Sequence, residues 1–218
     1  MKSRPIVALV HASRAAVDPV TNYFNRHAPH LDTVNLLDDG VMRMLAARDM
    51  QRALRRLDAM IQTAWTEYEP VAAILTCSAL APSAMEILRR RSPVITMKID
   101  EPMAQAAVCQ GTRIGVLASF PATVAATGDL LHALAPGPLR ITSELAEEAL
   151  RLLLAGDPGR HDLLLTEAFD RLAAHPLDAI VLAQVSMARL HETFQARTPI
   201  PVFSSLASCL QSVVNLIG

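Results

Sequence analysis

The segment Pro70-Val-Ala-Ala-Ile-Leu-Thr-Cys77-Ser-Ala has a near copy later in the chain, Pro176-Leu-Asp-Ala-Ile-Val-Leu-Ala-Gln184-Val. The two segments lie about 107 residues apart and align with a slip of one residue. Each begins with proline and continues as a short apolar run, which is typical of a strand buried inside a parallel sheet. A cysteine follows the first run, whereas the second copy has none.

Two further pairs of segments have nearly the same spacing. Ile6-Val-Ala-Leu-Val-His11 aligns with Ile114-Gly-Val-Leu-Ala-Ser119, and Pro93-Val-Ile-Thr96 aligns with Pro201-Val-Phe-Ser204. Three pairs in the same order predict a duplicated α/β unit. Equivalent strand ends of the two units would face one shared cleft, so Cys77 is a candidate reactive group and its missing counterpart bears on the reaction.

Short apolar runs alternate with longer amphipathic runs, which is the pattern of parallel sheets covered by helices on both faces. The expected strands are 5–10, 33–37, 71–76, 93–97, 113–118, 139–142, 178–183 and 201–203. The expected helices are 41–68, 82–91, 102–110, 121–134, 143–155, 159–174, 187–196 and 205–217.

These elements predict the α/β fold class, with two pseudo-symmetric domains that each have three layers and a parallel sheet. The active site is expected in the cleft between the two domains. The first domain should comprise residues 1–98 plus 204–218 and carry Cys77, because the chain is expected to return to the first half near residue 203. The second domain should comprise residues 99–203 and carry Gln184 and Ser186.

Composition limits the classes of partner. Of the 218 residues, 51% are hydrophobic, which is enough to bury a full core. A net charge of −1 offers no electrostatic footprint for nucleic acid or a membrane surface. No apolar stretch reaches the length of a membrane span, and the one near the N-terminus is too short for a signal peptide. Three cysteines without CxxC spacing fit reduced thiols. We expect a cytoplasmic protein, and apolar faces on its Ala- and Leu-rich helices are consistent with a homodimer.

Ligands of open α/β sheets bind beyond the carboxyl ends of the strands, so the residues at those ends are the site candidates. Hydroxyl groups and backbone amides dominate them, which suits a small carboxylate held by neutral donors at helix N-termini. The sequence has no glycine-rich phosphate loop and no metal-ligand spacing, so we expect neither a cofactor nor a metal. The candidates are His11, Ser13, Thr76, Cys77, Ser78, Asp100, Glu101, Ser119, Thr123, Gln184 and Ser186.

Cys77 is the candidate with the most specific predicted chemical role. A thiol that faces the amides of the turn after a strand should have a lowered pKa and act as a base or nucleophile near neutral pH. The alternative is an inert cysteine in an apolar strand. Cys109 and Cys209, in contrast, lie within expected helices on apolar faces, which indicates structural roles.

Two other candidates keep alternatives open. Asp100 or Glu101 either caps the helix that begins near Pro102, or reaches the cleft as a partner of the substrate, or orients Lys98. His11 is either a donor to the substrate or a hydrogen-bonded histidine at the rim of the sheet.

The motifs Ile74-Leu-Thr-Cys77-Ser-Ala, Ile180-Val-Leu-Ala-Gln184 and Ile114-Gly-Val-Leu-Ala-Ser119 with Thr123 resemble the aspartate/glutamate racemase superfamily. This group includes glutamate, aspartate and hydantoin racemases, maleate isomerase and arylmalonate decarboxylase. The resemblance covers most of the chain. It implies two pseudo-symmetric α/β domains, a cleft between them and cofactor-independent proton chemistry next to a carboxylate. Racemases of the group place one cysteine in each half, on opposite faces of the α-carbon.

The resemblance places Cys77 at the position of the first-half cysteine. The second-half position falls on Gln184, or on Ser186 if the alignment slips; glutamine cannot accept and return a proton, and serine would need an activating base. The chain is therefore identified as a single-cysteine variant, with Cys77 as acid/base or nucleophile and Ser186 as the other catalytic candidate. We expect an isomerase or racemase that acts on a small carboxylic acid, such as an amino acid or a dicarboxylate. The alternatives are a decarboxylase of a malonate-type acid and a non-catalytic small-acid binding protein.

Overall fold

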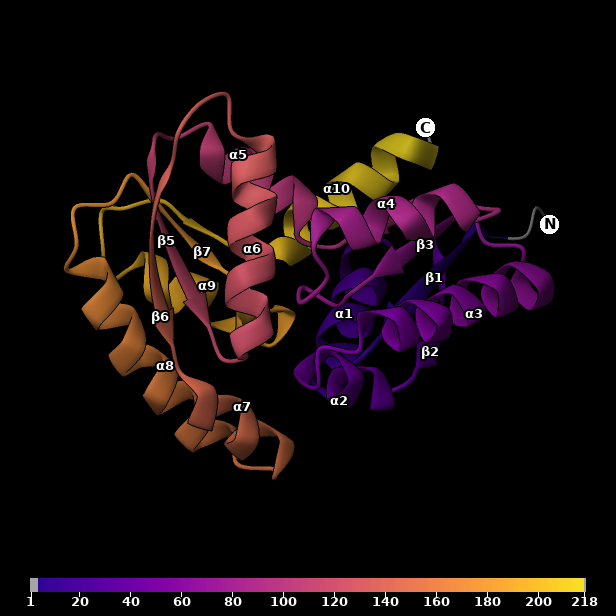
Figure 1. Cartoon of the computed structure of the whole chain (residues 1–218), viewed down its shortest axis with the longest axis horizontal. Coiled ribbons are helices and arrows are strands. Elements are labelled where there is room, and N and C mark those ends of the chain that lie inside the picture. Colours follow the sequence, from indigo (N-terminus) through magenta and orange to yellow (C-terminus); the bar gives the residue numbers. More distant parts are fainter. Residues whose placement is uncertain (1–3, 218) are drawn as a thin grey trace.

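The computed structural model describes residues 4–217, which contain two four-stranded sheets (Figure 1). All paired strands run parallel, and the strand orders are β2-β1-β3-β4 and β6-β5-β7-β8. The second order repeats the first with each number raised by four. The predicted α/β class with two pseudo-symmetric parallel sheets is confirmed.

The first half contains both a buried sheet centre and a partly exposed edge. β1 and β3 are almost completely buried, as their continuous apolar runs require, whereas β2 alternates between exposed and half-buried residues. Its strands are β1 (Ile6–His11), β2 (Asp32–Leu37), β3 (Ala72–Leu75) and β4 (Thr96–Lys98). Its helices are α1 (Arg14–His27), α2 (Gly40–Ala46), α3 (Met50–Tyr68) and α4 (Pro82–Arg91).

The second half repeats this arrangement, with β5 and β7 at the buried centre of its sheet. Its strands are β5 (Arg113–Ala118), β6 (Arg140–Leu145), β7 (Ala179–Leu182) and β8 (Val202–Phe203). The helices that follow β4 along the chain are α5 (Glu101–Val108), α6 (Pro121–Leu134), α7 (Glu147–Leu154), α8 (Pro158–Ala173), the 3-10 helix η1 (Val185–Leu190), α9 (His191–Gln195) and α10 (Ser205–Ile217).

Each sheet has a hydrophobic core on both faces, because successive side chains of a strand point to opposite sides. In β1, Ala8 and Val10 enter the core shared with α3 and α4, whereas Val7 and Leu9 enter the core shared with α1 and α10. β5 and β7 divide their side chains between two cores in the same way. None of the helices within residues 4–217 is long and apolar enough to cross a membrane.

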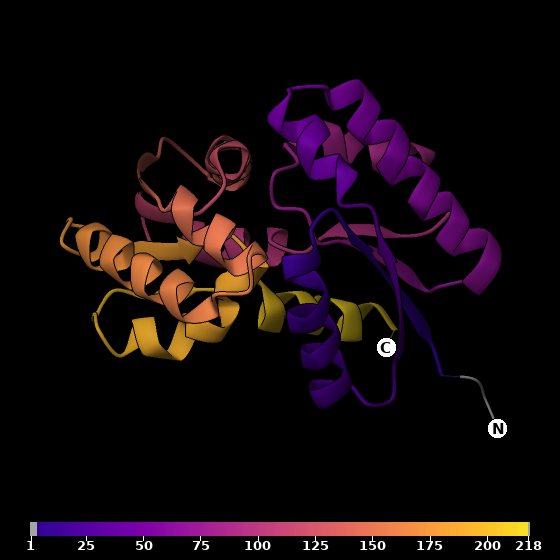
Figure 2. The ribbon, with the colours of Figure 1, turned by 90° about the horizontal axis from the view of Figure 1, so that it is seen from below.

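The last helix lies against the first sheet. Cys209, Leu210 and Val213 of α10 are buried in the same cluster as Val7 and Leu9 of β1. In Figures 1 and 2, α10 (yellow) runs from the second half to lie beside α1 (indigo) of the first half. The limits of the two domains remain a prediction.

Helix α1 was not expected from the sequence. Ala16, Val20 and Phe24 are buried at helical spacing, and the Ser13 hydroxyl caps the helix by accepting a hydrogen bond from the Ala15 N–H. This helical spacing of apolar residues was obscured by Pro19, the sixth residue of the helix. Proline lacks the N–H of a regular helical turn and normally ends a helix.

The expected single helix over 41–68 is also wrong, because a turn divides it into α2 and α3. Arg48 in that turn has a positive φ of 58°, which is incompatible with a continuous helix. Asp49 then begins α3 as its N-cap and accepts a hydrogen bond from the Arg52 N–H at 3.1 Å. The expected strand 139–142 extends further, as β6 to Leu145, so α7 begins at Glu147 rather than near residue 143.

Candidate active site

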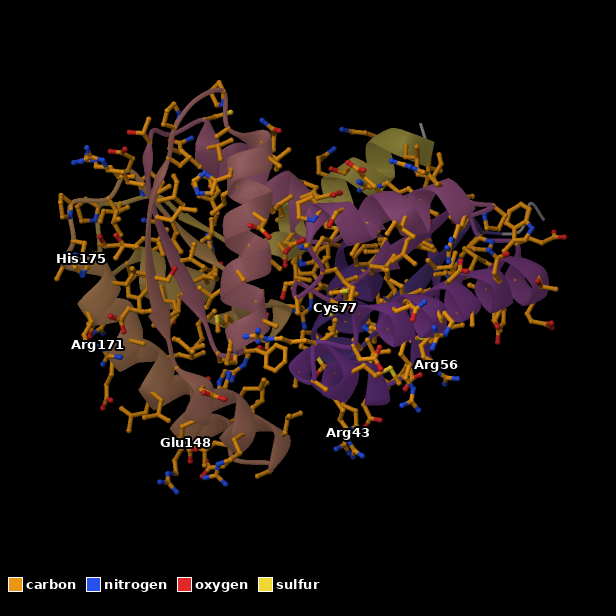
Figure 3. All side chains as sticks on the ribbon, in the orientation of Figure 1. Arg43, Arg56, Cys77, Glu148, Arg171 and His175 are labelled. Carbon is orange, nitrogen blue, oxygen red and sulfur yellow. The ribbon has the colours of Figure 1, made fainter. Side chains whose placement is uncertain are left out.

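One cavity lies where the carboxyl ends of β1, β3 and β7 meet the start of α6, and both halves of the chain line it. Figure 3 shows Cys77 near the middle of the molecule, where the two halves adjoin. The cavity measures about 40 Å³, so it has room for only a few water molecules. Its lining consists of Ala12, Ser13, Ala15, Ala16, Met42, Thr76, Cys77, Ser78, Ala79, Thr123, Leu150, Gln184, Val185 and Ser186.

Most of the predicted site residues line this cavity. The structure brings together Ser13, Thr76, Cys77, Ser78, Thr123, Gln184 and Ser186. His11, Asp100, Glu101 and Ser119 do not line it and lie behind residues that do. Among residues 4–217, no charged side chain lines the cavity, so a bound carboxylate would meet neutral donors there.

Equivalent backbone hydrogen bonds identify the counterpart of Cys77. The Thr76 N–H donates to the Val10 carbonyl at 3.0 Å, and the Ala183 N–H donates to the Leu117 carbonyl at 3.0 Å. Both the donors and the acceptors of these two bonds are 107 residues apart. The same offset relates Cys77 to Gln184, so an amide occupies the place of the second thiol and Ser186 lies two residues beyond it.

The Cys77 thiol is buried, with 6% of the residue exposed. Burial raises its pKa to about 11, although the Ala79 amide and the positive charge of Lys98 both favour the thiolate. The expected lowering of the Cys77 pKa is therefore wrong. The predicted amide contact exists, but loss of water around the thiol outweighs it.

A buried ion pair lies directly behind the Cys77 turn. Lys98 ends β4, and its Nζ donates to Asp100 Oδ2 at 3.1 Å and to the Ser78 carbonyl at 3.3 Å. Both charged side chains are 1% exposed. Burial raises the pKa of Asp100, against the opposing effect of the Lys98 charge. Lys98 therefore ties the turn that carries Cys77 to β4.

Of the roles that the sequence left open for Asp100 and Glu101, the structure is consistent with the one in which they orient Lys98. Asp100 stands at the N-cap position of α5 but makes no side-chain cap, because its carboxylate holds Lys98. Its other oxygen, Oδ1, is buried without a partner among the described residues. Glu101 pairs with Arg89 and accepts a hydrogen bond from the Lys98 N–H. Neither carboxylate faces the cavity, so the expectation that they bind substrate is not supported by their positions.

His11 and Ser119 hold cavity residues from behind. His11 is fully buried, with Nδ1 2.8 Å from Thr76 Oγ1 and Nε2 2.9 Å from Asn35 Oδ1. The Ser119 N–H and hydroxyl both donate to Gln184 Oε1, at 2.5 and 3.1 Å. With Oε1 engaged in this way, the Nε2 amide of Gln184 has no partner among the described residues and can donate to a ligand.

Charged side chains gather at an adjoining hollow, which shares Ala15 and Ser186 with the cavity. Arg14, Asp18 and Arg189 line this hollow. Arg189 is paired with Asp162, and Arg14 lies 3.5 Å from Asp39. The site thus combines an uncharged interior with arginines near its edge.

Some cavity residues were missed by the sequence analysis. Ala15 and Ala16 belong to α1, which was not expected, although Ser13 before Arg14-Ala-Ala is a recognisable N-cap signal. Met42 and Leu150 fall in the expected helices 41–68 and 143–155, and neither was predicted to line a site. Spacing places such residues on an apolar face but cannot distinguish a face that lines a cavity from one that fills a core.

The other two cysteines differ from each other. Cys209 is fully buried in α10, as expected. Cys109 is exposed at the C-cap of α5, so its expected place on a buried apolar face is wrong. Within residues 4–217, no three His, Cys, Asp or Glu side chains are grouped so that they could hold a metal ion.

Known proteins share both the sequence pattern and the fold. The Asp/Glu/hydantoin racemase family model matches residues 8–213. The glutamate racemase from Francisella tularensis subsp. tularensis SCHU S4, solved with D-glutamate, is 14% identical, with 100% of this chain and 82% of that chain covered and a TM-score of 0.76. The Picrophilus torridus aspartate racemase is 14% identical (97% and 93% covered, TM-score 0.72). The Klebsiella pneumoniae allantoin racemase is 15% identical (98% and 87% covered, TM-score 0.72). No curated protein matches this chain.

Proposed function

Because the chain belongs to the Asp/Glu/hydantoin racemase family, we propose that it is a racemase-type isomerase that moves a proton at the carbon next to the carboxylate of a small acid. The observation that carries this proposal is Cys77, a thiol in a cavity between two parallel sheets, surrounded by neutral hydrogen-bond donors. Cofactor-independent proton chemistry requires a positioned acid or base and a site for the carboxylate, and this cavity contains candidates for both.

Neutral groups would bind the carboxylate. Ser13 stands at the N-cap of α1, and Thr123 lies in the first turn of α6. Helix N-termini carry a partial positive charge and present unpaired N–H groups, which favour an anion. The Nε2 amide of Gln184 adds a donor from the other half of the chain. A monocarboxylate could bind in this way without any arginine in the cavity.

Cys77 would act on the adjacent carbon. With a pKa raised to about 11, the thiol is protonated near neutral pH, so it must lose this proton before it can act as a base on carbon. The resulting thiolate is a stronger base than an ordinary cysteine thiolate, so it can remove the proton from the carbon next to the carboxylate. Sulfur gains the proton that carbon loses, and return of a proton from the thiol to the carbanion-like intermediate completes one exchange.

Proton NMR in deuterated water would test the proposal. The panel should contain glutamate, aspartate, allantoin, hydantoins, dicarboxylates and substituted malonates, because solved structures of this fold include glutamate, aspartate and allantoin racemases. We expect deuterium to enter the α-carbon of one class, and Cys77→Ala to slow this by about 10²-fold or more. The exposed Cys109→Ala is the matched control and should exchange normally. Full exchange in Cys77→Ala would contradict the proposed function.

The amide at the position equivalent to Cys77 favours a second candidate. With Gln184 on one side and a thiol on the other, protonation from the Cys77 side alone is sufficient for decarboxylation of a malonate-type acid. Loss of a carboxylate from malonates in the same NMR experiment would identify this activity. A non-catalytic binding protein would show thermal stabilisation by one acid and no product.

A further inference from the structure

Helices from both halves of the chain contribute apolar side chains to the cavity. Met42 of α2 and Leu150 of α7 line it, together with Ala15 and Ala16 of α1. Met42 packs against the same hydrophobic cluster that contains Cys77. These side chains therefore extend the core into the cavity, and the part of a ligand that contacts them gains most free energy if it is apolar as well.

The charged side chains of α2 and α7 do not line the cavity. Figure 3 shows Arg43 of α2 and Glu148 of α7 directed outward, away from Cys77. Arg43 is exposed, and Glu148 is paired with Arg151 on the surface. Since the described part of the chain places no charged side chain in the lining, a second carboxylate on a ligand would lie there without a partner of opposite charge.

The arginines at the adjoining hollow do not supply that partner. Arg14 lies 3.5 Å from Asp39, and Arg189 is paired with Asp162. Asp18 also lines the hollow. Two positive and three negative side chains thus meet there, so the hollow has no surplus of positive charge to attract a second carboxylate.

The Cys77 thiol shows how poorly this cavity accommodates a negative charge. Loss of water raises its pKa to about 11, although the Ala79 amide and the Lys98 charge oppose this effect. The same loss of water disfavours an unpaired carboxylate. The carboxylate next to the reacting carbon differs, because it would meet the N-termini of α1 and α6 and the Gln184 amide. The cavity therefore offers compensation for one negative charge.

We propose that the substrate is a monocarboxylate with a short, uncharged, apolar substituent, and that Met42 and Leu150 select it over dicarboxylates; this inference rests on the proposed function. The carboxylate faces the neutral donors, and the substituent on the adjacent carbon packs against Met42 and Leu150. Met42 is partly exposed and unbranched, so it can move aside for substituents of different shape. The cavity volume of about 40 Å³ limits them to a few carbon atoms.

Protection of Cys77 from iodoacetamide, resolved by peptide mass spectrometry at one fixed pH, measures binding in this cavity. Butyrate and succinate are the probes, because both have four carbons and succinate carries a carboxylate in place of the terminal methyl group of butyrate. In the wild type, half-maximal protection should require at least about tenfold less butyrate than succinate. The exposed Cys109 is the internal control and should react at the same rate with either acid present.

A change of charge at Met42 should reverse this preference. Met42→Lys places a positive charge at the cavity on a side chain of similar length, so succinate should protect Cys77 at a lower concentration than butyrate does. Leu163→Lys is the matched control. It adds the same charge at a position that is 58% exposed and does not line the cavity, so it should keep the wild-type order.

Thermal unfolding of each variant separates loss of the fold from a change of preference, and the wild-type comparison requires no variant. The inference is overturned if succinate protects wild-type Cys77 as well as butyrate does, if butyrate gives no protection, or if a folded Met42→Lys keeps the wild-type order. Carbon exchange in a dicarboxylate that is lost in Cys77→Ala would support the proposed function and contradict this inference. Protection by butyrate without exchange in any acid of the panel, with 2-aminobutyrate added, would do the reverse.

Discussion

The Cys77 thiol links pH to the stability of the fold. Its pKa is about 11 in the folded protein and near 9 when the chain is unfolded and solvated. The folded state therefore holds this proton more tightly, so its contribution to stability is complete below pH 9 and is lost as pH rises toward 11. We expect this loss to amount to roughly 3 kcal/mol for the two-unit shift.

Urea unfolding at a series of alkaline pH values measures this effect. Cys77→Ser removes the titrating group, so the stability difference between wild type and variant should be constant below pH 9 and shrink above it. The exposed Cys109→Ser should follow the wild type at every pH. A constant difference between wild type and Cys77→Ser up to pH 11 would be inconsistent with a buried neutral thiol.

Lys98 and Asp100 should move the Cys77 pKa in opposite directions. Lys98→Met removes the positive charge and should raise the pKa, whereas Asp100→Asn removes the negative charge and should lower it, each by about one unit. Lys98→Met should also cost roughly 3–5 kcal/mol of stability, because it leaves Asp100 buried and unpaired. The pH dependence of Cys77 alkylation reports both shifts.

Arg56→Met is the matched control for this pair, since Arg56 pairs with Asp38 on the surface (Figure 3). It should leave the Cys77 pKa unchanged and alter stability by less than about 1 kcal/mol. Shifts of the same sign in Lys98→Met and Asp100→Asn would indicate that both act through distortion of the turn rather than through charge.

At the scale of elements, close packing of α8 on β5 depends on a glycine. A Cβ atom at Gly115 would lie 2.6 Å from Leu177 Cδ1 and 3.3 Å from Leu172 Cγ. We expect Gly115→Ala to destabilise the protein by about 1–3 kcal/mol through overpacking. Gly137→Ala is the control, because nothing lies within 4 Å of its Cβ position, and it should change stability by less than about 0.5 kcal/mol. Equal melting temperatures for the two variants would contradict this account.

The elements predicted correctly from the sequence are the central strands, because burial on both faces requires an apolar sequence. β1, β3, β5 and β7 lie at the centres of their sheets, and their uninterrupted apolar runs are what a strand buried on both faces requires. α1 was missed because Pro19 opposes the local helical preference, and packing of Val20 and Phe24 overrides it. The break between α2 and α3 was missed because Arg48 adopts a positive φ, which an arginine in the sequence does not predict.

The candidate site was predictable to the extent that it follows from strand ends. Cys77, Thr76 and Gln184 line the cavity because parallel strands bring their carboxyl ends together. The pKa of Cys77 was not predictable, because the sequence shows the favourable amide but not the degree of burial that opposes it. The pairing of Lys98 with Asp100 was equally hidden, since both residues could have faced the cleft.

At the scale of the whole molecule, the packing of α10 should stabilise the first domain rather than the second. Leu210 is 7% exposed and packs with β1 residues, whereas Leu216 on the same helix is 40% exposed. We expect Leu210→Ala to cost about 2–5 kcal/mol and Leu216→Ala less than about 0.5 kcal/mol. Hydrogen exchange should show the loss in β1 and β3, and not in β5 and β7. A loss concentrated in the second sheet would contradict the predicted domain limits of 1–98 plus 204–218 and 99–203.

The offset of 107 residues has a stereochemical consequence. Two matching halves place Cys77 and Gln184 at equivalent points of one cavity, but the groups at these points are unlike. A planar, prochiral intermediate held between them would meet a proton donor on its Cys77 side and an amide on the other. In the decarboxylase alternative, proton delivery from sulfur would then reach a single prochiral face and give one enantiomer, whereas inversion by a racemase-type isomerase requires a second proton carrier on the other face, for which Ser186 is the candidate.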